Sequence, residues 1–147
     1  MAVVLRDDGR HVEAASPARL PSDSVTVLEV YGSLFFAGAR TLQEELPGVA
    51  GASRPVVVLR LRGRTRVGAT LIDVLDGYAD DLEEVGGRLY LSGVHPDMAA
   101  QLRRAGKLDL DETVQLVPAG EVFGASTEDA IARASAWLAK PRVRDPD

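Results

Sequence analysis

Four arginines follow an apolar run in the middle of the chain, and their spacing suggests binding chemistry. They stand at every second position: Arg60, Arg62, Arg64 and Arg66. A helix is predicted to begin at Thr70, and the amides and dipole at a helix N-terminus attract anions. One interpretation is a loop that binds a small anion or an acidic partner, formed by Arg64, Thr65, Arg66, Gly68, Ala69 and Thr70. The alternative, which we favour, is a set of exposed arginines at a sheet end, some paired with acidic residues, because surface charges contribute little energy alone.

The same loop is close in spacing to a nucleotide-binding glycine loop. Residues 63–70 read GRTRVGAT, against the pattern GxxxxGK[ST]. Ala69 stands where the pattern has its lysine, and that lysine supplies the charge that holds the terminal phosphates. Thr70 does match. The sequence therefore gives little support to a phosphate cradle, and no cofactor is predicted.

Catalytic and metal-binding groups are few. The chain has no cysteine, and its two histidines, His11 and His95, lie far apart without the spacing of metal ligands. Ser92 is a sequence neighbour of His95, but His95 precedes Pro96 and is better explained as a residue at the start of a helix. No GxSxG nucleophile motif occurs. We therefore predict no catalytic residue, no metal site and no enzyme activity, and keep as candidates for a further binding surface Ser33, Ser92 and His95.

The arginine-rich loop joins a predicted strand to a predicted helix. Val56–Leu59 is an apolar, β-branched run typical of a strand buried in a sheet. After Thr70 the apolar period becomes that of an amphipathic helix, with an inward stripe of Leu71, Ile72, Leu75, Tyr78, Ala79, Leu82 and Val85. Thr70 is the predicted N-cap, with Asp73 completing a capping box. Gly86 and Gly87 end the helix before a strand over residues 88–92, so this stretch predicts a right-handed βαβ unit.

The remaining elements repeat this alternation. Strands are predicted over residues 25–31 and 113–117, and helices over 34–46 with Ser33 as N-cap, from Pro96 to Ala105, and after Ser126 as N-cap. Residues 93–96 are predicted to form a turn. The alternation predicts an α/β fold, a single domain with a mixed, mostly parallel sheet and about four helices in βα units.

The first 24 residues have a weaker pattern with two interpretations. One is an N-terminal arm or linker that contains a hairpin, with strands near residues 2–5 and 11–14. The other is a frayed terminus. The predicted domain spans residues 25–140, and residues 141–147 are a charged tail.

Composition narrows the classes of partner. The 147 residues, 46% of them apolar, are enough for one domain with a real core. The net charge of −5 argues against a protein that binds nucleic acid through bulk positive charge. No apolar run reaches the roughly 18 residues that a membrane helix needs, and no signal-peptide pattern occurs. The sequence as given therefore predicts a soluble, cytosolic chain.

Several segments together resemble the STAS domain. They read VYGSLFFAGA at residues 30–39, VVLRLRG at 57–63, AT at 69–70, GRLYLSGV at 87–94 and LRRAG at 102–106. More narrowly, the chain resembles the cytoplasmic C-terminal STAS domain of SulP-family sulfate and inorganic anion transporters, and the YGxLFF stretch is the specific part. The resemblance covers about residues 25–140. Bacterial anti-sigma-factor antagonists share this fold.

The resemblance implies a non-catalytic regulatory module that binds other proteins. The family motif before the second helix has aspartate, then serine or alanine, then serine or threonine, then glycine; the corresponding residues here are Gly68, Ala69, Thr70 and Leu71. Ala69 has no hydroxyl, so the serine that antagonists phosphorylate is absent, whereas Thr70 keeps the neighbouring hydroxyl. A phosphate at a helix N-terminus would change the charge of a docking surface sharply.

Three hypotheses follow for function. The first is a regulatory domain on the cytoplasmic face of the membrane, whose partners are the transmembrane domain of its own anion transporter or cytosolic proteins. The second is a free-standing signalling protein like the antagonists, with Thr70 as the phosphorylated residue. The third is a module that binds a nucleotide or small anion through Arg64, Arg66 and the amides near Gly68. A homodimer is compatible with each.

Overall fold

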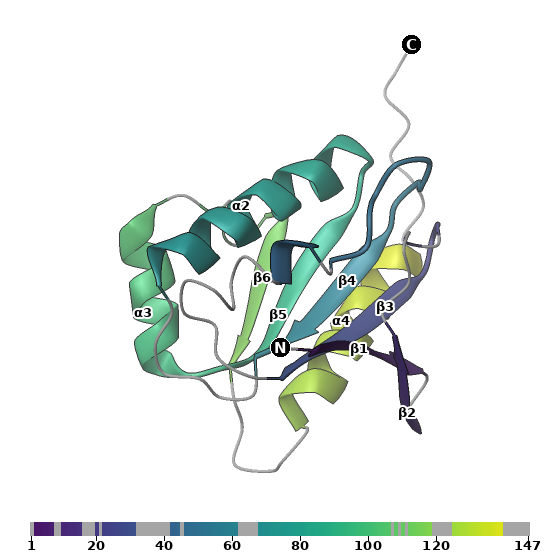
Figure 1. The fold of residues 1–147 in the computed structure, drawn as a ribbon, viewed down its shortest axis with the longest axis horizontal. Coiled ribbons are helices and arrows are strands. Elements are labelled where there is room, and N and C mark those ends of the chain that lie inside the picture. Colours follow the sequence, from purple (N-terminus) through teal and green to yellow (C-terminus); the bar gives the residue numbers. More distant parts are fainter. Residues whose placement is uncertain are drawn as a thin grey trace.

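The protein is a six-stranded sheet with helices on both faces (Figure 1). The computed structural model describes residues 2–7, 10–15, 20, 22–31, 42–44, 46–61, 68–106, 108, 110, 112–118 and 125–139. The strands are β1 (Ala2–Asp7), β2 (Arg10–Ala15), β3 (Val25–Tyr31), β4 (Val56–Arg60), β5 (Arg88–Val94) and β6 (Val114–Pro118). The helices described are α2 (Ala69–Glu84), α3 (Pro96–Ala105) and α4 (Ala125–Ala139).

The sheet has the order β2-β1-β3-β4-β5-β6. The four strands from β3 to β6 are parallel, and β1 is antiparallel to both β2 and β3. The predicted α/β fold with a mixed, mostly parallel sheet is therefore confirmed. Residues 42–44 are helical and Leu46 is a bend, whereas residues 34–41 and 45 of the predicted helix 34–46, with its cap Ser33, lie outside the described residues.

The N-terminal hairpin belongs to this sheet. Strands β1 and β2 are antiparallel neighbours, and β1 pairs with β3 from Ala2 opposite Tyr31 to Arg6 opposite Val27. These ladder hydrogen bonds make β1 and β2 continuous with the parallel strands.

Strand β4 is buried because both of its faces are covered. Val57 and Leu59 pack in the cluster shared with α2 and α3, whereas Val56 and Val58 pack in the cluster shared with α4. Figure 1 shows α2 and α3 in front of the sheet and α4 behind it. This two-sided burial explains why the strand is a continuous apolar run without alternation.

Helix α2 buries most of the predicted stripe. Its buried residues are Leu71, Ile72, Val74, Leu75, Tyr78, Ala79 and Leu82. Val85 is half-buried and forms the C-cap. The amides of Val85 and Gly87 donate to the Leu82 carbonyl oxygen, and the Gly86 amide donates to the Glu83 carbonyl oxygen. The Tyr78 hydroxyl donates to the Pro47 carbonyl oxygen at 2.8 Å, which ties the segment after residues 42–44 to α2. Burial, and then the nearby Asp81 carboxylate, raise the pKa of Tyr78 well above its usual range.

Two predicted boundaries are wrong. Strand β5 continues to Val94, through residues predicted as a turn, because Gly93 takes a φ of 67° at an irregular register and Val94 returns to the core. Helix α4 begins at Ala125, so Ser126 lies inside its first turn rather than at the N-cap. Helix α3 spans Pro96–Ala105 as predicted and ends at the C-cap Gly106.

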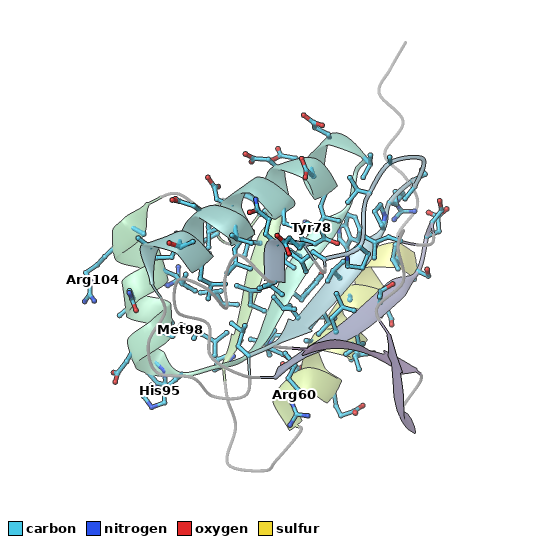
Figure 2. All side chains as sticks on the ribbon, viewed as in Figure 1. Arg60, Tyr78, His95, Met98 and Arg104 are labelled. Carbon is cyan, nitrogen blue, oxygen red and sulfur yellow. The ribbon has the colours of Figure 1, made fainter. Side chains whose placement is uncertain are left out.

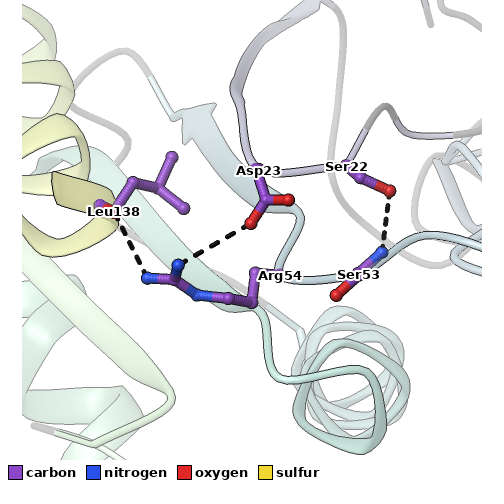
Figure 3. Close-up of polar contacts among 5 residues, drawn as sticks. All are labelled: Ser22, Asp23, Ser53, Arg54 and Leu138. Atoms are coloured by element: carbon purple, nitrogen blue, oxygen red, sulfur yellow. Dashed lines mark hydrogen bonds and ion pairs between the residues drawn. The ribbon is translucent and has the colours of Figure 1, made fainter. Parts of the chain in front are cut away.

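The edge at which the parallel strands begin, here called the amino edge, is held by contacts across the sequence (Figure 3). The Arg54 guanidinium donates to the Leu138 carbonyl oxygen at 3.3 Å and lies 3.7 Å from the Asp23 carboxylate. Arg54 and Arg88 also lie over the Trp137 ring, 5.2 and 4.7 Å from its centroid. The C-terminal end of α4 is thereby fixed to the loops that begin β4 and β5.

Candidate functional site

The candidate site is the opposite edge of the sheet, where the parallel strands end and α2 and α3 begin; we call it the carboxyl edge. Gly68 is the N-cap of α2 in extended backbone, with φ −85° and ψ 164°. The first helical hydrogen bond runs from the Ile72 amide to the Gly68 carbonyl oxygen at 3.3 Å. The amides of Ala69, Thr70 and Leu71 precede this bond, and no side chain caps the helix among the described residues.

The prediction that Thr70 caps α2 is wrong. The helix begins at Ala69, so Thr70 is its second residue and Asp73 lies too far into the helix for a capping box. Glycine is an acceptable N-cap because it adopts the required extended conformation without cost, although it offers no side-chain oxygen. The consequence is a helix start without a side-chain cap among the described residues.

The motif residues at this helix start differ in exposure. Ala69 is exposed and Thr70 is half-buried. The exposed position therefore carries a methyl group, and the only hydroxyl of the pair is the less accessible one. Arg64, Thr65 and Arg66, the other residues of the predicted loop, lie outside the described residues.

His95 starts the second helix at this edge. It is the N-cap of α3, and its Nδ1 accepts the Asp97 backbone N–H at 3.1 Å. The same nitrogen lies 3.7 Å from the Asp97 carboxylate. These contacts confirm the favoured interpretation of His95 as a residue that begins a helix, and a nitrogen used in this way is not available as a catalytic base. Pro96 follows in the first turn, where it needs no hydrogen bond.

Two further sequence-based expectations are corrected here. Ser92 is fully buried, so it does not contribute to a binding surface, and Arg60, expected among exposed arginines, is only 5% exposed. The two residues are register partners on β4 and β5, on strands covered from both sides. By strand alternation both residues lie on the face of the sheet that also carries Val56, Val58 and Tyr90.

The described residues bring together the start of α2 and His95, and they include neither a metal site nor a membrane-spanning segment. No group of three His, Asp or Glu side chains among them is placed to hold a metal ion. Within the same residues, none of the helices has the length and apolar character required to cross a bilayer. What the edge offers chemically is backbone donors, a small exposed side chain and a helix dipole.

The comparisons with known proteins fit this arrangement. The sequence profile of the STAS domain matches residues 17–120, well over half of the chain. Searches of the curated proteins and of the solved structures give no match. STAS domains are generally non-catalytic regulatory domains that commonly mediate protein–protein interactions, and their fold is related to that of anti-sigma-factor antagonists. From the profile match and the sheet topology together, this chain belongs to the STAS domain family.

Proposed function

We propose that this STAS domain is a regulatory module of a SulP-type anion transporter, and that it docks onto the transporter or a cytosolic protein through the carboxyl edge. One observation carries the proposal: helix α2 begins at this edge with an exposed Ala69 and no side-chain cap. Partners of such sheets usually meet the loops after the carboxyl ends of the strands. The small side chain of Ala69 at the start of α2 lets the backbone of a partner approach closely.

The association with a transporter is supported by sequence rather than by geometry. The YGxLFF stretch, at residues 31–36, is the part of the chain that most specifically resembles the SulP type. Ala69 also removes the serine on which the antagonist switch depends. On this proposal, docking is not controlled by a phosphate at residue 69, and the domain acts on the cytoplasmic side of the membrane.

A second candidate function is a free-standing signalling protein of the antagonist type. The half-buried Thr70 in the first turn of α2 favours it, because a phosphate there would add strong negative charge close to the helix N-terminus. Incubation with an anti-sigma-factor kinase should then label Thr70, and Thr70→Val should abolish the label. Absence of label on the wild-type chain would eliminate this candidate.

The main proposal is tested by locating the domain in its native cells. An antibody raised against the 147-residue chain should detect a much larger polypeptide in the membrane fraction. A signal only at the size of the chain, in the soluble fraction, would contradict the proposal and favour the second candidate.

Docking is tested by substitution in the full native protein. Ala69→Glu places a bulky carboxylate at the exposed start of α2 and should alter anion uptake. Ala136→Glu, the same change at an exposed position of α4 behind the sheet, is the matched control and should leave uptake unchanged. Equal effects of the two variants would show that the carboxyl edge is not the docking surface.

A further inference from the structure

A groove lies on the flank of α2, separate from the carboxyl edge. It is an open groove of about 280 Å³ between the segment after residues 42–44 and the middle of the helix, and its described lining consists of Gln43, Leu46, Pro47, Gly48, Val49, Val74, Gly77, Tyr78 and Asp81. Pockets that enclose whole drug-sized ligands hold roughly 300–1,000 Å³. This groove is therefore sized for one or two side chains rather than for a complete metabolite.

The walls of the groove are held together before any partner arrives. The hydrogen bond from the Tyr78 hydroxyl to the Pro47 carbonyl oxygen, 2.8 Å long, joins the helix to the opposite segment. Figure 2 shows Tyr78 on the side of α2 that faces the sheet. A preformed groove loses little conformational freedom on binding, which favours affinity.

Gly77 has no role in the packing of the described structure. It lies inside α2, where glycine is less favourable than alanine, and it is exposed. A Cβ added at this position would meet no neighbour within 4 Å. The missing side chain instead widens the groove at its helical wall, and this allows a partner to lie directly against the helix backbone.

The charge of the groove selects the kind of partner. Asp81 is exposed at its rim, and none of the nine described lining residues is basic. The surroundings add further acidic residues at exposed positions: Glu44, Asp73, Asp80, Glu83 and Glu84. A groove of mixed polarity, with aliphatic side chains in its lining and a carboxylate at its rim, is complementary to a long side chain with an apolar stem and a cationic end.

We propose that this groove binds an arginine side chain of a partner protein. The methylene stem would lie along Leu46, Val49 and Val74, and the planar guanidinium would pair with the Asp81 carboxylate in a two-pronged contact that lysine cannot make. Arginine is also among the residues that most often anchor protein interfaces in such pockets. The groove and the carboxyl edge are separate surfaces, so this inference does not depend on the proposed function.

The test is an NMR titration of the isotopically labelled full chain with N-acetylarginine amide. The matched probe is N-acetylcitrulline amide, which has nearly the same shape without the charge. We expect saturable shifts of the amides of Val49, Gly77 and Asp81 with the arginine probe, and about tenfold weaker binding of the citrulline probe, since hydrogen bonds between charged groups are the strong ones. Asp81→Asn should reduce arginine binding to the citrulline level, whereas Asp80→Asn, at a neighbouring exposed carboxylate outside the lining, should retain it.

Filling the groove provides a second variant. Gly77→Leu enters open space, so the protein should keep its spectrum elsewhere while the arginine shifts disappear. The proposal is overturned if the two probes bind equally, if the shifts spread along the acidic residues of α2 without saturating, or if Asp81→Asn and Asp80→Asn behave alike.

Discussion

Two helix ends in this molecule are built in opposite ways. The C-terminal end of α4, at the amino edge, receives the Arg54 guanidinium on a carbonyl oxygen and holds Trp137 beneath two arginines. The N-terminal end of α2, at the carboxyl edge, begins at Gly68 without a side-chain cap. The first end connects residues 84 positions apart, from Arg54 to Leu138. The difference indicates that the amino edge holds the fold together, whereas the described start of α2 has no comparable side-chain contact. The docking proposed at the carboxyl edge would use this helix start.

The largest effect is expected at the amino edge from Gly87→Ala. Gly87 is buried between α2 and β5, and an added Cβ would clash with the backbone carbonyl oxygen of Pro55 and approach that of Leu82. Backbone cannot move aside as a flexible side chain can, so the free energy of unfolding should fall by about 3 kcal/mol. Urea denaturation measures it.

The matched control for this variant is Gly106→Ala. Gly106 has a φ of 65° and open space around its Cβ, so only the left-handed conformation is penalised, by about 1 kcal/mol. If Gly87→Ala is no more damaging than Gly106→Ala, the amino edge is less tightly packed than its contacts imply.

The next largest loss is expected for Arg54→Ala, which should lower the free energy of unfolding by about 2 kcal/mol. The substitution removes a charged hydrogen bond and a cation–π contact. The Arg54 side chain is only 15% exposed, whereas that of Asp23 is 61% exposed. Asp23→Asn should therefore cost much less, about 0.5 kcal/mol, since exposed ion pairs contribute little. Equal losses in the two variants would show that Arg54 stabilises the fold through its ion pair with Asp23. The contacts of Arg54 with Leu138 and Trp137 at the end of α4 would then contribute little.

Tyr78 lies between the two edges and makes stability depend on pH. Its folded-state pKa is raised, so the neutral phenol is the form that the fold favours. The contribution of Tyr78 to the free energy of unfolding is fully present below the unfolded-state pKa of about 10. Above that pKa it falls by up to about 1.4 kcal/mol for each pH unit. The difference in unfolding free energy between wild type and Tyr78→Phe, measured at several pH values from neutral to strongly alkaline, should shrink above that pKa. A constant difference would contradict this assignment.

The smallest change in stability is expected at the carboxyl edge. Ala69→Glu puts a carboxylate beside the free amides and dipole of α2, and the protein should become more stable by about 0.5 kcal/mol at low ionic strength. Added salt should reduce this gain. A marked loss of stability would show that the start of α2 is packed in a way that its exposure does not suggest, and the contrast between the two edges would fail.

Patterns that depend on neighbouring residues were predicted well from the sequence. The stripe from Leu71 to Leu82 identified the buried face of α2, and Pro96 and Gly106 marked the ends of α3. The N-cap of α2 was misplaced because threonine is the better capping residue, whereas Gly68, which occupies the N-cap, has no side-chain oxygen that would mark it. Gly93 indicated a turn, yet the strand continues through it with an irregular register.

Features that join distant segments gave no local signal. The contact between Arg54 and Trp137 spans most of the chain, and neither residue belongs to a recognisable motif. The groove beside Gly77 likewise requires two segments to meet. The burial of Arg60 depends on what covers that face of the sheet, which periodicity within β4 cannot specify. At the candidate site, the motif located Ala69 and Thr70, but their exposure came only from the three-dimensional structure.

The strand order has a consequence for how the protein is made. Each strand after the first pairs with one that precedes it in the chain: β2 and β3 with β1, β4 with β3, β5 with β4, and β6 with β5. Once β1 and β2 have paired, the sheet can therefore grow at the other side of β1, strand by strand, in the sequence in which a ribosome delivers it. Helix α4 is synthesised last, and it packs against Val56, Val58 and Tyr90. A nascent chain that stalls before residue 125 would therefore lack this helix. It would expose these apolar side chains to chaperones.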